Sequence, residues 1–165
     1  MPIRLGDLLV KHGALTEDQR EAIVAQQELI PRPFGVLAEE MFGVSPADVE
    51  HAWAVQYAAI APMIDPQEHI IEPELLDMVE RRQAWQFGLI PMYTKDGVTM
   101  FATCTQFLAR ALRFVGWRFE GSCSFSICSY DDLIRGLKLH YPLEGLSDEM
   151  MHRLINRQDA GKDAA

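Results

Sequence analysis

Histidines and paired carboxylates are the residues of this sequence that could carry out acid–base or metal chemistry, but their spacing supports neither. The five histidines show no H-E-x-x-H motif and no paired spacing typical of metal ligands. These histidines are His12, His51, His69, His140 and His152. The acidic pairs Glu39-Glu40 and Asp131-Asp132 are typical of solvated or helix-capping positions. We therefore predict no catalytic residues and no metal site.

The sequence also lacks the motifs of nucleophilic catalysis and of phosphate transfer. The sequence has no G-x-x-x-x-G-K-[ST] loop, no nucleophile elbow and no local Cys-His motif. The cysteines Cys104, Cys123 and Cys128 are an odd number without metal-ligand spacing, which is typical of reduced thiols in the cytosol. We expect them to act as small apolar residues within strands. The chain is predicted not to be an enzyme and to need no cofactor.

Charge and hydropathy exclude two further classes of protein. The formal net charge is −9 and the pI is about 4.9, and the basic residues are scattered among acidic ones. Short helices would allow a helix-turn-helix DNA binder, but nucleic-acid binding needs a basic stripe that is absent. No apolar run approaches the roughly 20 residues of a membrane span, and the N-terminus lacks the layout of a signal peptide. We predict a cytoplasmic protein with no nucleic-acid partner and no membrane insertion.

The N-terminal part of the sequence contains a duplicated segment, whose helices would position any functional site there. When the first segment is shifted by 29 positions, six pairs of like residues fall in register, which exceeds what chance produces. The pairs are Leu5 with Phe34, Gly6 with Gly35, Leu8 with Leu37, Leu15 with Val44, Thr16 with Ser45, and Gln27 with Gln56. Each copy therefore predicts the same local structure, a short helix, a turn and a longer helix.

Helix start and stop signals locate these elements. In the first copy, Gly13 ends a helix over residues 5–12, and Thr16 with Gln19 forms a capping box for a helix over residues 17–27. The second copy repeats this pattern with a break at Gly43, an N-cap at Ser45, Pro46 in the first turn and Asp48 at the N3 position. Two prolines interrupt the linker at residues 29–33.

The remaining sequence predicts a small α/β half in the order helix, strand, strand, helix, strand, helix. The expected elements are a helix from Pro73 to about Val79, strands over 86–93 and 98–103 around a turn at Asp96-Gly97, a helix over 107–115 ending at Gly116, a strand over 124–128, and a helix from Ser129 to about Tyr141. We predict an α+β chain in which an N-terminal helical bundle precedes a three-stranded sheet with helices on one face.

Three segments follow from this pattern. We expect a duplicated helical subdomain over 1–60, an α/β subdomain over 61–142, and a short helix with a disordered tail over 143–165. The short helix would start at the N-cap Ser147. Its apolar stripe could dock on a partner or pack on its own domain. That stripe comprises Met150, Met151, Leu154 and Ile155.

The first copy also resembles a known motif. The stretch from Arg4 to Leu15, followed by Gln27, is similar to the tandem motif R-L-G-x-x-[LVI]-[LVI]-x-x-G of MshEN or T2SSE-N domains. These are the N-terminal regulatory domains of type II secretion and type IV pilus assembly ATPases. The stretch Gly88 to Met92 and the Asp96-Gly97 turn match the α/β half of that family, so the resemblance covers roughly residues 3–142. We expect the chain to stand without the ATPase domain of that family, because its G-x-x-x-x-G-K-[ST] loop does not occur in the sequence.

The resemblance implies a ligand surface and two kinds of partner. In many members of that family the motif binds cyclic di-GMP, and the domain precedes an assembly ATPase and docks on a membrane-platform protein. Carried over, the ligand positions would be Arg4, Leu5, Gly6, Leu9, Val10, Gly13, Gln27, Arg32, Gly35 and Gln56. A guanidinium can fork onto guanine, glycine lets the backbone approach a phosphate, and aliphatic residues form a dry surface for the bases.

The second copy departs from the motif. Pro33 stands at the arginine position with Arg32 one residue early, and the aliphatic pair becomes Ala38 and Glu39. Two hypotheses therefore stay open. In the first, the chain is a non-catalytic adaptor that binds a secretion or pilus platform protein or assembly ATPase. In the second, it is a cyclic di-GMP receptor that uses the tandem motif.

Overall fold

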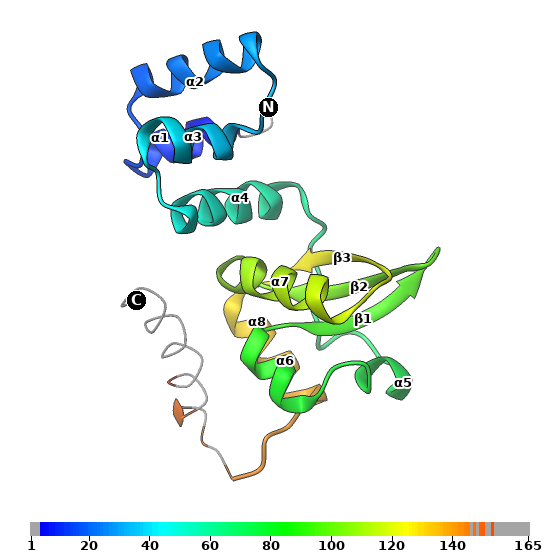
Figure 1. Ribbon diagram of the computed structural model, residues 1–165. Helices are drawn as coiled ribbons and strands as arrows, with labels where there is room; N and C mark the ends of the chain where they lie inside the picture. The colour runs from blue at the N-terminus through cyan, green and yellow to red at the C-terminus, as the bar shows by residue number, and fades with distance from the viewer. Residues whose placement is uncertain (1–3, 146, 148, 151–152, 154–165) are drawn as a thin grey trace. The chain divides into compact units, whose positions relative to one another are not determined.

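The computed structural model describes residues 4–145, 147, 149, 150 and 153 (Figure 1). Contacts divide the chain into two compact units, Met1–Ala61 and Pro62–Ala165. The first unit is helical and the second contains the sheet, which gives the predicted α+β class.

The first unit consists of two helical hairpins, as the repeat predicts. Its helices are α1 (Leu5–Lys11), α2 (Glu17–Leu29), α3 (Phe34–Phe42) and α4 (Pro46–Ile60). The Thr16 hydroxyl accepts a hydrogen bond from the Gln19 backbone amide, and the Gln19 side-chain oxygen accepts one from the Thr16 backbone amide. Ser45 accepts from the Asp48 amide in the same way. Gly43, in the left-handed region with φ of 66°, ends α3. These caps confirm the predicted boundaries.

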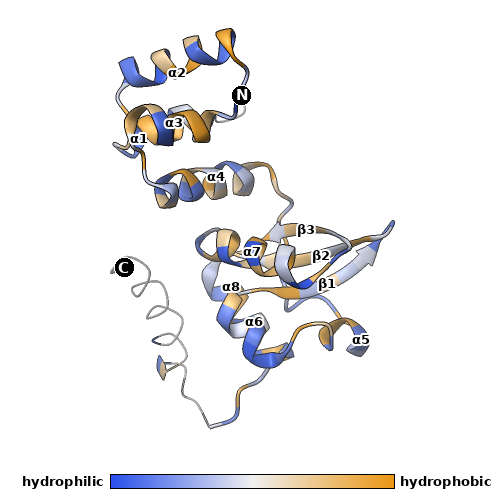
Figure 2. Cartoon of the chain, in the orientation of Figure 1, coloured by the Kyte–Doolittle hydropathy of each residue, from blue (hydrophilic) through white to orange (hydrophobic). Residues whose placement is uncertain are grey.

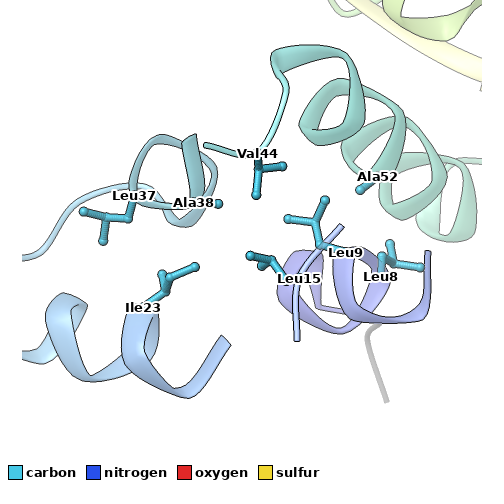
Figure 3. Close-up of a cluster of buried hydrophobic side chains, with 8 residues drawn as sticks. All are labelled: Leu8, Leu9, Leu15, Ile23, Leu37, Ala38, Val44 and Ala52. Carbon is cyan, nitrogen blue, oxygen red and sulfur yellow. The ribbon is translucent and has the colours of Figure 1, made fainter. Parts of the chain in front are cut away.

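The core of the first unit preserves the repeat (Figure 3). Its buried side chains form four pairs of positions that are 29 residues apart. They are Leu8 with Leu37, Leu9 with Ala38, Leu15 with Val44, and Ile23 with Ala52. Helix α1 packs mainly on α4, and α2 packs mainly on α3. Each short helix thus packs chiefly on the long helix of the other copy, so neither hairpin buries its apolar face alone.

The second unit is built on a three-stranded sheet in the order β1-β2-β3. Strand β1 (Ile90–Lys95) is antiparallel to β2 (Val98–Thr103), and β2 is parallel to β3 (Ser122–Ile127). The turn between β1 and β2 has positive φ at both Asp96 and Gly97, 52° and 77°. This geometry is that of a type I′ hairpin, as the Asp-Gly signal predicts.

Over residues 62–145, which the structure describes in full, four helices and a short 3-10 turn accompany the sheet. They are α5 (Pro73–Leu76), α6 (Arg81–Phe87), η1 (Thr105–Phe107), α7 (Leu108–Arg118) and α8 (Tyr130–His140). Ser129 accepts from the Asp132 amide and caps α8 as predicted. The indole of Trp85 on α6 donates to the Tyr141 carbonyl at 2.7 Å, and the Tyr141 hydroxyl donates to the Leu76 carbonyl at 2.6 Å. Tyr141 therefore ties together α5, α6 and the end of α8.

Three local predictions for this half were wrong. Residues 86 and 87 belong to α6 rather than a strand, because Glu80 and Gln83 start a helix that Gly88 ends with φ of 67°. The helix expected from Pro73 ends at Leu76. Helix α7 continues through Gly116 to Arg118. A glycine ends a helix only where the backbone turns left-handed.

The helices also cover both faces of the sheet, not one as expected. Phe101 and Phe125 are paired in register and lie on one face, where Phe101 meets the ring of Phe119 at the end of α7. Ile90 lies on the opposite face and reaches Gly136 on α8. Alternation along the strands explains this arrangement, since the apolar residues of β2 point both ways.

The C-terminal helix signal lies mostly outside the described residues. Ser147 accepts a hydrogen bond from the Met150 amide at 3.2 Å, consistent with the predicted N-cap. Met151, Leu154, Ile155 and the tail over 158–165 fall outside the described part of the chain.

Candidate functional site

Two glycines of the tandem motif hold the helices of the first unit close together. A Cβ placed on Gly6 of α1 would lie 2.7 Å from the ring of Phe34, and one on Gly35 of α3 would lie 2.7 Å from a methyl of Val49. Leu5 lies 3.7 Å from the same Cβ position on Gly35. Leu5 and Phe34 are equivalent in the repeat, so each copy places one side chain over the other copy's glycine. The structure therefore brings Leu5, Gly6 and Gly35 together at the crossing of α1 and α3.

Gln27 and Arg32 meet at the linker between the copies. The Gln27 amide donates to the Arg32 carbonyl at 2.8 Å, which fixes the linker to α2. The Arg32 guanidinium donates two hydrogen bonds to the Glu40 carboxylate, at 2.7 and 2.8 Å. This forked pair joins the linker to α3.

The Arg32–Glu40 pair shifts the pKa of each group in the direction that favours its charged form. The hydrogen bond from Arg32 lowers the pKa of Glu40, with the nearby positive charge adding to the effect and desolvation opposing it. The same hydrogen bond raises the pKa of Arg32. A ligand phosphate or base that engages Arg32 must therefore compete with a carboxylate that already fills its fork.

The other carried-over positions are dispersed over the unit. Leu9 is only 1% exposed and belongs to the core, and Val10 packs against that core. Gly13 is exposed in the left-handed region, and Gln56 lies half-buried on α4. Arg4 is the exposed N-cap residue of α1, and its side chain has no hydrogen bond or ion pair with the described residues. Arg4 is thus the motif position whose side chain is most open to a ligand.

Sequence reasoning missed two partners in this region. Glu40 is expected at a solvated or helix-capping position; its side chain is 54% exposed and also pairs with Arg32, which the sequence does not predict. The repeat pairs Phe34 with Leu5 without predicting a contact for it, whereas its ring covers Gly6. Glu40 gave no signal because Arg32 precedes α3, so the pair lacks the regular spacing of residues on one helix face. Phe34 could have been found from the repeat, since Leu5 occupies its equivalent position.

The cysteines of the second unit are poorly suited to chemistry. Cys104 and Cys128 are buried, and desolvation raises their pKa values to about 11 and about 12. Cys123 is half-buried, and desolvation raises its pKa as well. Since the thiolate is the reactive form, these thiols are weak nucleophiles at neutral pH.

The second unit also contains a hollow of about 330 Å³. Its lining combines apolar and charged residues from α5, the start of α6 and the end of α8. These residues are Pro73, Leu76, Asp77, Val79, Glu80, Arg81, His140 and Tyr141. The His140 ring is already bonded to the Pro66 carbonyl at 2.9 Å. The hollow therefore presents opposite charges without one dominant ligand chemistry.

Across the described residues, no three His, Cys, Asp or Glu side chains gather closely enough to hold a metal ion. In that same part of the chain, no helix has the length and apolar character needed to span a bilayer.

The fold defines the class of this protein, an α+β chain in which a duplicated helical hairpin precedes a small mixed sheet in the sequence. No protein-family model matches the sequence, and no curated protein matches it. Among solved structures, the chain is similar to MshE with cyclic di-GMP at 20% identity and a TM-score of 0.47, covering 84% of this chain and 99% of that one.

Two structures of the N-terminal domain of XpsE are also similar. One has 16% identity and a TM-score of 0.44 and covers 82% of this chain and 92% of that one. The other has 17% identity and a TM-score of 0.41 and covers 79% and 89%. These domains are of the kind that the sequence motif resembles. At TM-scores below 0.5, the likeness assigns no ligand, partner or activity to this chain.

Proposed function

We propose that this chain is a non-catalytic regulatory or adaptor domain that acts through contacts with other proteins. The supporting observation is that most motif positions are engaged inside the first unit. Arg32 is held by Glu40, Gln27 binds the linker, and Leu9 lies in the core. A ligand surface built from these groups would need them free.

Exposed apolar side chains of the first unit support the same proposal. They belong to α2, the linker, α3 and the end of α4. They are Val24, Leu29, Ile30, Val36, Met41 and Ile60. Leu29 is 77% exposed and is followed by Ile30 at 57%. Adjacent large apolar residues on a surface are typical of protein-interaction sites.

The proposed partners are a secretion or pilus platform protein or an assembly ATPase in the cytoplasm. Purified cytoplasmic domains of both, taken from the same genome, should be titrated into the chain by calorimetry. We expect one of them to bind with micromolar or tighter affinity. Replacing Leu29 and Ile30 by serine tests the surface, with Ile70→Ser as the matched control because Ile70 is fully exposed in the second unit. The absence of binding to either protein would contradict the proposal.

A second candidate function is a cyclic di-GMP receptor that uses the first copy of the motif. The observation in its favour is the exposed guanidinium of Arg4, directly before Leu5 and Gly6. Calorimetric titration with cyclic di-GMP decides the question. The receptor predicts micromolar or tighter binding that is lost in Arg4→Ala and kept in Arg82→Ala, an exposed arginine of the second unit. No heat at high ligand concentration would exclude it.

A further inference from the structure

Two histidine rings from different helices meet on the surface of the first unit. His12 follows α1 as its C-cap residue, and His51 lies in the first half of α4. Their ring centroids are 5.5 Å apart, and the ring planes are tilted by 43°. Both residues are exposed, so ions in solution can reach the rings. Because 39 positions separate the two residues in the sequence, no motif spacing links them.

The backbone that carries each ring is held in place by the core. The His12 amide donates to the Leu8 carbonyl at 2.9 Å, and Leu8 is a buried core residue. His51 directly precedes Ala52, which is fully buried in the same core. Figure 3 shows Ala52 beside the leucines of α1, and Figure 2 shows hydrophilic and hydrophobic residues interspersed along α4. The two rings therefore stand on packed helices, which is the support that a binding site needs.

The distance between the rings suits two ligands of one metal ion. Zinc lies about 2.0–2.1 Å from an imidazole nitrogen, which places it about 3.2 Å from the centre of that ring. Two such rings at a tetrahedral angle have centroids about 5.2 Å apart. The observed separation of 5.5 Å is close to this value. Since exposed side chains rotate freely, one nitrogen of each ring can turn toward a common ion.

The donor atoms and the charge of the first unit favour a cation. Imidazole is a preferred ligand of zinc, copper and nickel ions. Residues 1–61 carry nine Asp or Glu and four Lys or Arg, so the unit attracts cations. Asp48, exposed one turn before His51 on α4, adds negative charge nearby, whereas Lys11 beside His12 opposes it. An anion would have to bind against the net charge of this unit.

We propose that His12 and His51 chelate a divalent transition-metal ion of the zinc class, with water in its other coordination positions. Among the described residues, no third His, Cys, Asp or Glu completes a metal-binding group, so the pair supplies both protein ligands. The bound ion bridges α1 and α4 and thereby stabilises the first unit. This proposal departs from the sequence-based prediction of no metal site, which depended on spacing along the chain. The site is separate from the protein contacts proposed above.

The test uses the full chain, treated with EDTA and free of any polyhistidine tag, and titrates it with ZnCl₂ by calorimetry. A structural zinc site has four ligands, so two ligands should bind one Zn²⁺ per chain with a Kd of about 1–100 μM. MgCl₂ should show no binding, because Mg²⁺ requires oxygen ligands. His12→Gln and His51→Gln should each weaken zinc binding about tenfold or more, since one ligand alone cannot chelate. His69→Gln, at an exposed histidine of the second unit, should leave binding unchanged.

Two further measurements distinguish this pair from other zinc ligands. Zinc at about ten times its Kd should raise the Tm of the first unit by about 6–10 °C, and His51→Gln should abolish this rise. In long-range ¹H–¹⁵N NMR spectra, zinc should shift the ring nitrogens of His12 and His51 and leave those of His69 unchanged.

Unchanged zinc affinity in both His12→Gln and His51→Gln, when their circular dichroism is native, would overturn the proposal. The absence of zinc binding up to about 1 mM would do the same. One zinc per two chains, with dimerisation in the ultracentrifuge, would overturn the water-completed site and assign its open positions to a second copy.

Discussion

Replacing Gly35 by alanine should destabilise the first unit, although alanine is the better helix former. Gly35 lies in α3, and a Cβ there would stand 2.7 Å from a Val49 methyl. Valine in a helix has one strongly preferred χ1 rotamer, so this methyl cannot rotate away cheaply. The added carbon must therefore push α3 and α4 apart or force Val49 off its rotamer.

The change in the free energy of unfolding caused by Gly35→Ala is the sum of two opposing terms. Gly→Ala within a helix contributes about 0.8–1 kcal/mol through propensity, whereas overpacking a tight contact costs about 1–3 kcal/mol. Gly116→Ala in α7 provides the control, because its Cβ would meet nothing within 4 Å. The propensity term is common to both, so the difference between the two substitutions should be about 1–3 kcal/mol. For a unit this small, each kcal/mol corresponds to about 4–8 °C in Tm.

The assay is thermal unfolding, followed by circular dichroism and tryptophan fluorescence. Trp53 is the tryptophan of the first unit, whereas Trp85 and Trp117 belong to the second, so fluorescence reports both units and a variant with Trp85→Phe and Trp117→Phe reports the first alone. Adding Val49→Ala to Gly35→Ala should restore part of the loss through a coupling of about 0.5–3 kcal/mol. If Gly35→Ala raises the Tm as Gly116→Ala does, the proposed close packing of α3 on α4 is refuted.

Three further outcomes follow from the same structure. Ser45→Ala should lower stability by about 1 kcal/mol in denaturant unfolding because it removes the cap of α4, and Ser45→Asp should retain the cap. In an NMR titration the Glu40 carboxyl should have a pKa below its ordinary range, and Arg32→Ala should return that pKa to the ordinary range. Because the pKa of Glu40 is lower in the folded state, the pair stabilises the fold at pH values above the unfolded-state pKa. This stabilisation is lost as the pH falls through the folded-state pKa. Timed alkylation of the native chain should modify Cys123 before Cys128, because Cys128 is buried with a pKa raised to about 12, and equal rates would contradict this burial.

Local signals explain why the first unit was predictable. A helix start can be predicted from four consecutive residues when a hydroxyl N-cap is followed three positions later by a polar residue, as at Thr16 and Ser45. Left-handed Gly43 marks the end of α3 in the same local way. The repeat then reinforced each assignment, because two copies carried the same signals. The turn at Asp96 and Gly97 was predictable for the same reason.

What the sequence could not show depends on contacts between distant residues. Gly116 and Gly88 are both glycines after an apolar helical stretch, but only Gly88 adopts a left-handed backbone. The ring of Phe107 lies within 3 Å of a Cβ placed on Gly88, so the tight turn there is part of the core packing. Among the candidate site residues, the forked pair of Arg32 with Glu40 likewise depends on the path of the linker. Neither contact has a periodic signature in the sequence.

The second copy departs from the ligand motif at Ala38 and Pro33, and the core of the first unit shows which of the two affects ligand binding. Leu9 and Ala38 occupy equivalent positions, and both are buried in one cluster. A close-packed core fixes total volume, so a large residue in one copy is balanced by a small one in the other. Ala38 is thus accounted for by packing and removes no surface group. Pro33, by contrast, is exposed where the first copy has Arg4, so it removes a surface guanidinium. The receptor hypothesis therefore depends on Arg4, together with an Arg32 that must first leave its carboxylate partner.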